Sequence, residues 1–180
     1  MFVMTNRRGV SLRSGARPTP MTLRVKRRKR PSTSVPSFVG LKPASEAASR
    51  SKRANRKRNT RPELLLRKAA WALGLRFRTH VPGLPGNPDL VFARARVVVF
   101  CDGDFWHGRE WRRLRVQLLR RHNSAYWIAK IRRNRKRDRE QTSQLIRAGW
   151  MVLRLWETEI VHSPNSAAAM VLQLVRSRIT

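Results

Sequence analysis

Residues 97–100, Val-Val-Val-Phe, form an unbroken apolar run that constrains the fold more than any other segment. A short apolar run rich in β-branched side chains is typical of a strand that is buried on both faces. We therefore expect a central strand over residues 96–102, in a sheet that helices cover on both sides. The run leads directly into Cys-Asp-Gly-Asp-Phe-Trp-His-Gly, residues 101–108. Core packing alone does not explain so many acids and aromatics at the end of a buried strand.

The surrounding segments predict an α/β fold with a mixed central sheet flanked by helices. Residues 89–93 lie one short polar step before the central strand, which indicates an antiparallel neighbour. Further strands are expected over residues 76–81 and 150–156. Helices are expected from the T-x-x-E capping box at Thr60 to Gly74, over residues 123–148, and over residues 166–178. The expected order is α-β-β-β-α-β-α.

The charge balance indicates a polyanionic partner. The 180 residues include 41 Lys+Arg and 10 Asp+Glu, a formal net charge of +31. Residues 1–50 carry 12 of the basic residues and one acid, and we expect them to form a disordered basic arm. Residues 51–180 carry the remaining 29 basic and 9 acidic residues, and we expect them to form one folded domain. Double-stranded DNA is the first candidate partner, and a solvated basic surface or a ribosome-like packing protein are the alternatives.

Other features bear on compartment and assembly. Cys101 is the single cysteine, which excludes an internal disulfide and a multi-cysteine zinc site. No stretch approaches the ~20 apolar residues of a membrane span. We therefore expect a cytoplasmic, nucleoid-associated protein that does not bind membranes. A monomer is the simplest expectation, because no heptad repeat or spare apolar face is evident.

Two carboxylates are expected to converge at one edge of the sheet. Asp89 stands at the start of one predicted strand and Asp102 at the end of its neighbour. Such a pair suits Mg²⁺, which takes one or two carboxylates and leaves room for a phosphate oxygen. His107 follows five residues after Asp102 and could activate a water or protonate a leaving oxygen. Taken alone, the Pro88-Asp89 pair is more typical of a loop turn or a strand cap than of catalysis.

Aromatic and basic residues follow the acids. Phe105 and Trp106 could stack on bases or wedge between base pairs, or they could pack beneath the loop. Trp127 adds a further aromatic among arginines. The predicted helix over residues 123–148 carries the candidate phosphate-contacting residues Arg132, Arg133, Arg135, Lys136 and Arg137.

Five blocks of this sequence, in order and spacing, resemble the very short patch repair (Vsr) DNA mismatch endonuclease family. The blocks are residues 59–67, 84–89, 100–108, 126–138 and 149–157. The resemblance implies a restriction-endonuclease-like fold of the PD-(D/E)xK type. It also implies a Mg²⁺-dependent nick in duplex DNA beside a T:G mismatch, with mismatch-repair proteins as further candidate partners.

The resemblance also implies roles for individual residues. Asp89 falls on the family's metal-binding catalytic aspartate and His107 on its catalytic histidine. Glu63 falls on a glutamate that supports the catalytic water, although its place in the predicted capping box would explain it equally well. Cys101 falls on the position whose backbone carbonyl helps to hold the metal. The aromatics that wedge into DNA beside the mismatch correspond to Phe105, Trp106 and Trp127.

The sequence departs from the family pattern in two places. Asp102 replaces a second active-site histidine, and we expect this carboxylate to take a more direct part in holding the metal. The family's structural zinc ligands are missing, and their neighbourhoods hold Asp104, Gly108, Arg109, Trp111 and Thr158. We therefore expect a zinc-free branch of the family. A restriction-like or structure-specific nuclease with another target, or a non-catalytic basic DNA-binding protein, are the alternative functions.

Overall fold

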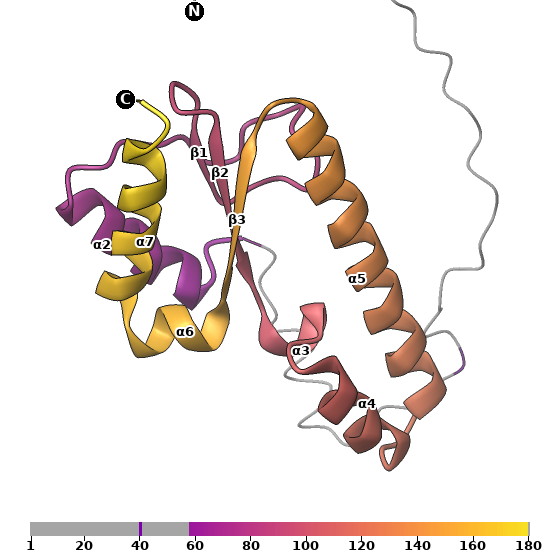
Figure 1. Ribbon diagram of the computed structural model, residues 1–180. Helices are drawn as coiled ribbons and strands as arrows, with labels where there is room; N and C mark the ends of the chain where they lie inside the picture. The colour runs from indigo at the N-terminus through magenta and orange to yellow at the C-terminus, as the bar shows by residue number, and fades with distance from the viewer. Residues whose placement is uncertain (1–39, 41–57, 180) are drawn as a thin grey trace, which may run out of the picture. The chain divides into compact units, whose positions relative to one another are not determined.

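The computed structural model describes residue 40 and residues 58–179. The predicted basic arm, and its boundary with the folded domain at residues 50 and 51, lie outside the described residues. Figure 1 shows the elements. In chain order they are α2 (Arg61–Ala72), β1 (Leu90–Phe92), β2 (Val97–Asp102), α3 (Asp104–His107), α4 (Trp111–Leu119), α5 (Ser124–Arg147), β3 (Met151–Trp156), α6 (Glu157–His162) and α7 (Pro164–Arg176).

The sheet has three strands in the order β1-β2-β3, so the apolar strand is central as predicted. Strand β1 pairs with β2 in antiparallel fashion, with Leu90 opposite Val99. Strand β3 pairs with β2 in parallel, with Phe100 opposite Arg154. Because β1 and β2 run in opposite directions, the start of β1 and the end of β2 lie at the same edge of the sheet. The predicted convergence of residues 89 and 102 follows from this pairing.

The side chains of β2 alternate between two apolar clusters, one on each face of the sheet. Val97 and Val99 pack with residues of α2 and α7, and Val98 and Phe100 pack with Leu145 of α5. Figure 1 shows α2, α6 and α7 on one face and the long α5 on the other. All of the residues from 97 to 100 are buried, which explains why this strand is apolar at every position.

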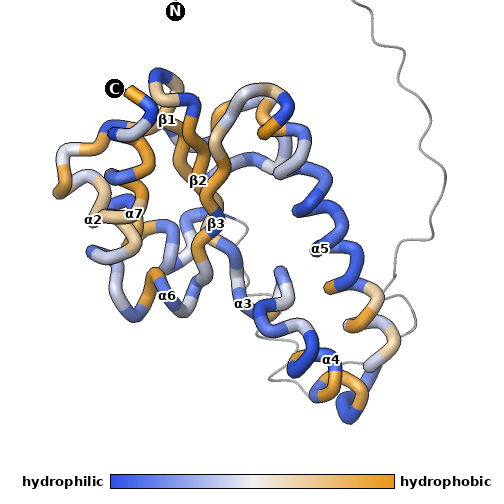
Figure 2. Tube along the Cα trace, viewed as in Figure 1, coloured by the Kyte–Doolittle hydropathy of each residue, from blue (hydrophilic) through white to orange (hydrophobic). Residues whose placement is uncertain are grey.

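Helix α5 is the most polar of the long elements. Figure 2 shows hydrophilic residues along most of its length, with apolar positions near its start and near its end. Ile131 and Leu145 are its fully buried apolar residues. The expected helix over residues 123–148 is confirmed, and it ends before Gly149, which has the positive φ of +79° that a glycine readily adopts.

The predicted strand over residues 76–81 is wrong. In this segment Arg78 forms an isolated bridge with Val91, through two backbone hydrogen bonds of 2.9 and 2.8 Å. His80 has a left-handed φ of +54°, which turns the chain out of the extended conformation. The short helices α3, α4 and α6 were not predicted, because each spans too few residues to show a sustained helical period.

Candidate active site

Asp89 is fixed at the sheet edge by the backbone of β2. Its N–H donates to the carbonyl of Val99 at 2.9 Å, and its Oδ2 accepts from the N–H of Cys101 at 2.7 Å. Burial raises the pKa of Asp89 from 3.8 to about 6, against the hydrogen bond from Cys101, and the charges of Glu63 and Asp102 raise it further. The positive charge of Arg67 lowers this pKa too little to offset burial, so most of the carboxylate's charge is uncompensated, and a bound cation would supply the missing positive charge.

Glu63 is buried beside this edge and accepts three hydrogen bonds. Its Oε2 accepts from the N–H of Asn59 and from Nη2 of Arg67, each at 2.9 Å, and its Oε1 accepts from the hydroxyl of Thr60 at 2.9 Å. The predicted capping box is therefore wrong, because the Thr60 hydroxyl donates to Glu63 and caps no backbone N–H of the helix. The position of the Glu63 carboxylate is therefore set by hydrogen bonds from Asn59, Thr60 and Arg67, which are close to it in the sequence.

Arg67 is a site residue that the sequence did not reveal. Its Nη1 donates to Oδ1 of Asn59 at 2.7 Å while Nη2 pairs with Glu63, and its charge lowers the pKa of Asp89. Its Nε is buried without a hydrogen-bond partner among the described residues. The i, i+4 spacing from Glu63 on a helix was the signal that could have identified it.

His107 lies against a carboxylate from another part of the chain. Its Nδ1 is 2.7 Å from Oδ2 of Asp138 on α5 and 3.6 Å from Oδ1 of Asp102. Burial acts to raise the pKa of Asp138, but the hydrogen bond and charge of His107, with Arg154, outweigh it and lower this pKa. Asp138 is thus ionised and can only accept, so Nδ1 carries the proton that it donates. With the proton on Nδ1, Nε2 is the ring nitrogen left to accept a proton.

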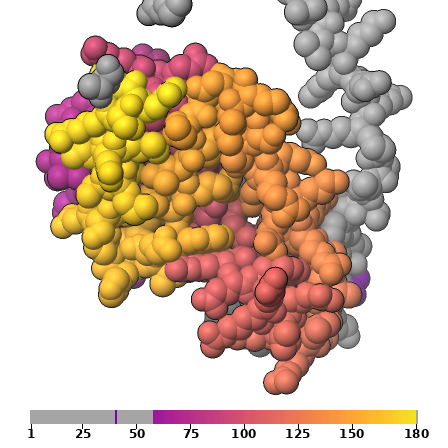
Figure 3. All heavy atoms as spheres, viewed as in Figure 1, coloured from indigo at the N-terminus to yellow at the C-terminus, as the bar shows by residue number. Residues whose placement is uncertain are grey.

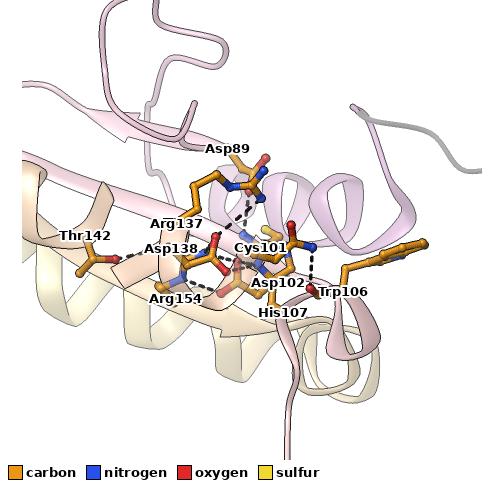
Figure 4. A network of polar contacts seen from close by, with 10 residues as sticks. Asp89, Cys101, Asp102, Trp106, His107, Arg137, Asp138, Thr142 and Arg154 are labelled. Atoms are coloured by element: carbon orange, nitrogen blue, oxygen red, sulfur yellow. Dashed lines mark hydrogen bonds and ion pairs between the residues drawn. The ribbon is translucent and has the colours of Figure 1, made fainter. Parts of the chain in front are cut away.

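Arg154 on β3 pairs with both of these carboxylates. Its Nε and Nη2 donate to the two oxygens of Asp102 at 2.6 and 2.7 Å, and Nη2 lies 3.6 Å from Oδ1 of Asp138. The guanidinium also lies over the Phe100 ring, 4.6 Å from its centroid. Figure 4 shows this network, with His107, Asp102, Asp138 and Arg154 drawn together. Both oxygens of Asp102 are therefore engaged by an arginine.

Asp138 and Arg154 were not predicted from the sequence as residues of the site. Asp138 stands among the arginines of α5, where an acid reads as one half of a surface ion pair, yet it is 9% exposed. Arg154 alternates with the apolar residues of β3, which suggests an outward-facing side chain. Asp138 reaches its partners only because the crossover connection packs α5 against the sheet.

The Cys101 side chain takes no part as a nucleophile. Burial raises the pKa of the Cys101 thiol well above its usual range, and the charge of Asp89 adds to this effect. The sulfur is therefore a neutral thiol. The backbone of Cys101 is the part of this residue that faces the site, through its bond to Asp89.

The three aromatic residues named from the sequence form one cluster. The ring centroids of Phe105 and Trp106 are 5.1 Å apart, and those of Phe105 and Trp127 are 5.6 Å apart. The backbone carbonyl of Trp106 accepts a hydrogen bond of 2.9 Å from Asn134. All three side chains are partly exposed, and Figure 4 shows the Trp106 ring pointing away from the carboxylates. The side chains of the cluster are thus neither fully buried nor fully exposed.

The predicted basic stripe of α5 divides into two parts. Arg132, Arg133 and Lys136 are exposed. Arg135 is partly buried, with its guanidinium 5.4 Å from the centroid of the Trp111 ring. In Figure 3 the residues of α3 and α4 and of the first half of α5 form a protruding part of the visible surface. Arg135 therefore helps to pack this part, while the other four residues face solvent. Among these, Arg137 is exposed and its Nη2 lies 3.8 Å from Oδ1 of Asp138.

Comparison with known proteins identifies the family. The family model described as DNA mismatch endonuclease Vsr matches residues 44–113. The type II nicking enzyme V.NmeDIP of Neisseria meningitidis serogroup C is 44% identical over 124 residues, which cover 69% of this chain and 82% of that protein. The chain belongs to the Vsr family. It is therefore a DNA-cleaving hydrolase, and DNA is its substrate.

Two other Vsr-like relatives span similar parts of the chain. The type II nicking enzyme V.HpaIIP of Haemophilus parainfluenzae is 35% identical over 127 residues, 71% of this chain and 89% of that protein. The DNA mismatch endonuclease Vsr of Escherichia coli strain K12 is 39% identical over 114 residues, 62% of this chain and 71% of that protein.

Within the described residues of this Vsr-family chain, none of the helices is long and apolar enough to cross a membrane.

Proposed function

We propose that this Vsr-family protein is a Mg²⁺-dependent endonuclease that nicks one strand of duplex DNA beside a T:G mismatch. We also propose that its three-stranded sheet and helices form a restriction-endonuclease-like fold of the PD-(D/E)xK type. The observation that carries the proposal is the position of Asp89, whose uncompensated carboxyl lies at the same sheet edge as the His107–Asp138 pair. A cation-binding acid beside a proton-transfer pair is the arrangement that phosphodiester hydrolysis requires.

The residues at the edge fit a magnesium ion. In the part of the chain that the structure describes, no three His, Cys, Asp or Glu side chains form a ready-made metal cluster. Mg²⁺ is usually held by one or two carboxylates, with waters and substrate phosphate completing its shell. Asp89 and the backbone carbonyl of Cys101 would hold it here. Asp102 would join them only by giving up a bond to Arg154. When bound, Mg²⁺ would polarise the scissile phosphate and neutralise charge that develops there.

His107 is the residue that moves the proton. With its Nδ1–H donated to Asp138, its Nε2 can take a proton from the attacking water as the water oxygen bonds to phosphorus. The bond from phosphorus to the leaving ester oxygen breaks in the same displacement, and a solvent water protonates that oxygen. Asp138 then stabilises the imidazolium that results. Arg154 holds Asp102 and lies close to Asp138, so that the two acids beside His107 stay correctly placed. Glu63 adds negative charge near Asp89 from a position fixed by Arg67.

The DNA contacts would come from the aromatic cluster and from α5. Phe105, Trp106 and Trp127 are partly exposed and already in mutual contact, so they can be inserted into DNA as a preformed wedge. The exposed residues Arg132 and Arg133 would contact phosphates. Family membership favours cleavage over the alternative of a non-catalytic DNA-binding protein.

The experiment is a nicking assay on a duplex with one T:G mismatch, run in Mg²⁺ and in EDTA. Wild type should nick in Mg²⁺ and be inactive in EDTA, and Asp89→Asn should be inactive in both. Glu140→Gln is the matched control, because it removes one exposed acid from α5 and should retain full activity. Equal nicking by wild type and Asp89→Asn would refute the proposal. A panel of matched, mismatched and branched duplexes separates mismatch nicking from the restriction-like and structure-specific alternatives.

A further inference from the structure

A set of polar contacts joins α3 to the first turn of α6, and we call it the α3–α6 network. Its members are Asp104, Arg109, Thr158 and Glu159. The hydroxyl of Thr158 donates to Oδ2 of Asp104. Arg109 donates from Nη1 to Oδ1 of Asp104 at 3.4 Å and from Nη2 to Oε1 of Glu159 at 3.0 Å. The network thus connects two segments that are about fifty residues apart in the sequence.

The network secures one side of α3, which carries Phe105 and Trp106 of the aromatic wedge. The other side is secured on α5, where Asn134 donates to the carbonyl of Trp106 at 2.9 Å. Gly108 lies so close to α5 that an added Cβ would be 2.9 Å from side-chain atoms of Ile131 and Arg135. Figure 1 shows α3 between α6 and the lower half of α5. A helix of only four residues owes its position to such links, because its own hydrogen bonds are too few.

The network stands where the resemblance places structural zinc ligands, and these residues do not fit zinc. Those neighbourhoods hold Asp104, Gly108, Arg109, Trp111 and Thr158. Zinc in proteins is bound by cysteine, histidine or carboxylate side chains, and of these five residues only Asp104 offers one. Among the described residues, no three such side chains gather where they could hold a metal ion. The Arg109 guanidinium already supplies positive charge next to the Asp104 carboxylate. A metal cation there would meet this charge and find too few ligands.

We propose that the Asp104–Arg109 pair, anchored on α6, positions the aromatic residues of α3 for DNA in place of a structural metal ion. Asp104 directly precedes Phe105 and Trp106, so the pair fixes the start of the segment that bears them. The guanidinium of Arg109 also lies 5.9 Å from the centroid of the Trp156 ring, at the end of β3. Asp104 and Arg109 act through the wedge and are positioning residues.

The α3–α6 network contributes little to stability, so we expect its loss to have a local effect. Asp104 and Arg109 have side chains that are 31% and 30% exposed, and the side chain of Glu159 is 48% exposed. Ion pairs at this exposure contribute little to global stability. Loss of the network should therefore leave the global unfolding transition nearly unchanged. It should instead allow α3 to open more often, because such local openings depend on a few contacts.

The test compares Arg109→Met with Arg113→Met by hydrogen exchange. Both variants lose one positive charge from the same region, but Arg113 is 76% exposed and pairs at 3.6 Å with nearby Glu110, so it links no separate elements. Arg109→Met should speed exchange in residues 103–110 by about tenfold, as expected for the loss of about 1.4 kcal/mol. Arg113→Met should change it by less than about twofold. Arg109→Lys should restore most of the protection, since it keeps the charge. Equal exchange in the two methionine variants would overturn the proposal.

Two further readouts complete the experiment. Zinc titration of the full-length protein should give no stoichiometric binding and no rise in Tm, whereas tight one-to-one binding would overturn the proposal. The DNA readout rests on the proposed function: Arg109→Met should lower the ratio of nicking on mismatched to matched duplex, with kcat on saturating mismatched duplex retained. A lower kcat with an unchanged ratio would overturn the positioning role. If wild type does not nick mismatched DNA, the proposed function fails, while hydrogen exchange still decides the network.

Discussion

Substitution of Asp89 by asparagine should make the metal-free protein more stable while abolishing its activity. Asparagine can still accept the hydrogen bond from the N–H of Cys101, but it removes the buried charge. The pKa of Asp89 is about 6 in the folded protein against an ordinary value of 3.8. At about 1.36 kcal/mol for each pH unit between these values, the ionised carboxylate costs the folded state at most about 3 kcal/mol.

The pH dependence has a definite sign. Because the folded pKa is raised, the folded state binds the proton more tightly, and this advantage is present in full below pH ~4. It is lost as the pH rises through about 6, where the charged carboxylate is left buried. Asp89→Asn should therefore gain its full stability above pH ~6 and little below pH ~4.

Urea unfolding in EDTA at pH 4.5 and pH 8 measures this directly. The difference in unfolding free energy between Asp89→Asn and wild type should be larger at pH 8. Asp138→Asn is the control of opposite sign, because the pKa of Asp138 is lowered and its charge stabilises the fold. Added Mg²⁺ should stabilise wild type and not Asp89→Asn. An Asp89→Asn variant that is no more stable at pH 8, or equally stabilised at both pH values, would refute the reasoning.

Three other substitutions test separate parts of the account. His107→Ala should slow nicking by roughly 10²–10⁴-fold with DNA affinity retained, as measured by single-turnover kinetics; a rate within a few-fold of wild type would contradict a proton-transfer role. Trp106→Ala should reduce the preference for mismatched over matched duplex more than it reduces overall DNA affinity, and a uniform loss on all duplexes, measured by titration, would count against a wedge. Gly108→Ala should lower Tm, because its φ is +68° and its Cβ would lie 2.9 Å from α5, and an unchanged Tm would show that α5 can yield.

The central strand and its position in the sheet were predictable because burial on both faces requires apolar residues at every position. Residues 97–100 meet this requirement, and the structure places them in the middle strand. The convergence of Asp89 and Asp102 followed from the antiparallel pairing of two adjacent strands. Local sequence was enough for these features, since each depends on neighbours within about a dozen residues.

Contacts between distant segments were not predictable in this way. The partners of His107 and Asp102 are Asp138 on α5 and Arg154 on β3, which lie more than thirty residues away along the chain. A charged residue on an amphipathic element is usually solvated, and its burial becomes apparent only when the parallel crossover brings α5 and β3 to the same edge. The strand predicted over residues 76–81 does not form either. Its apolar residues pack against the two core clusters as part of a loop.

The central claim is that this site makes a single-strand break directed by a T:G mismatch. The most direct measurement is to label each strand of a mismatched duplex and to map the products of wild-type cleavage in Mg²⁺ at single-nucleotide resolution. The account predicts one break, in one strand, beside the mismatch, and none in the matched duplex. Breaks in both strands, breaks away from the mismatch, or equal cleavage of the matched duplex would contradict it.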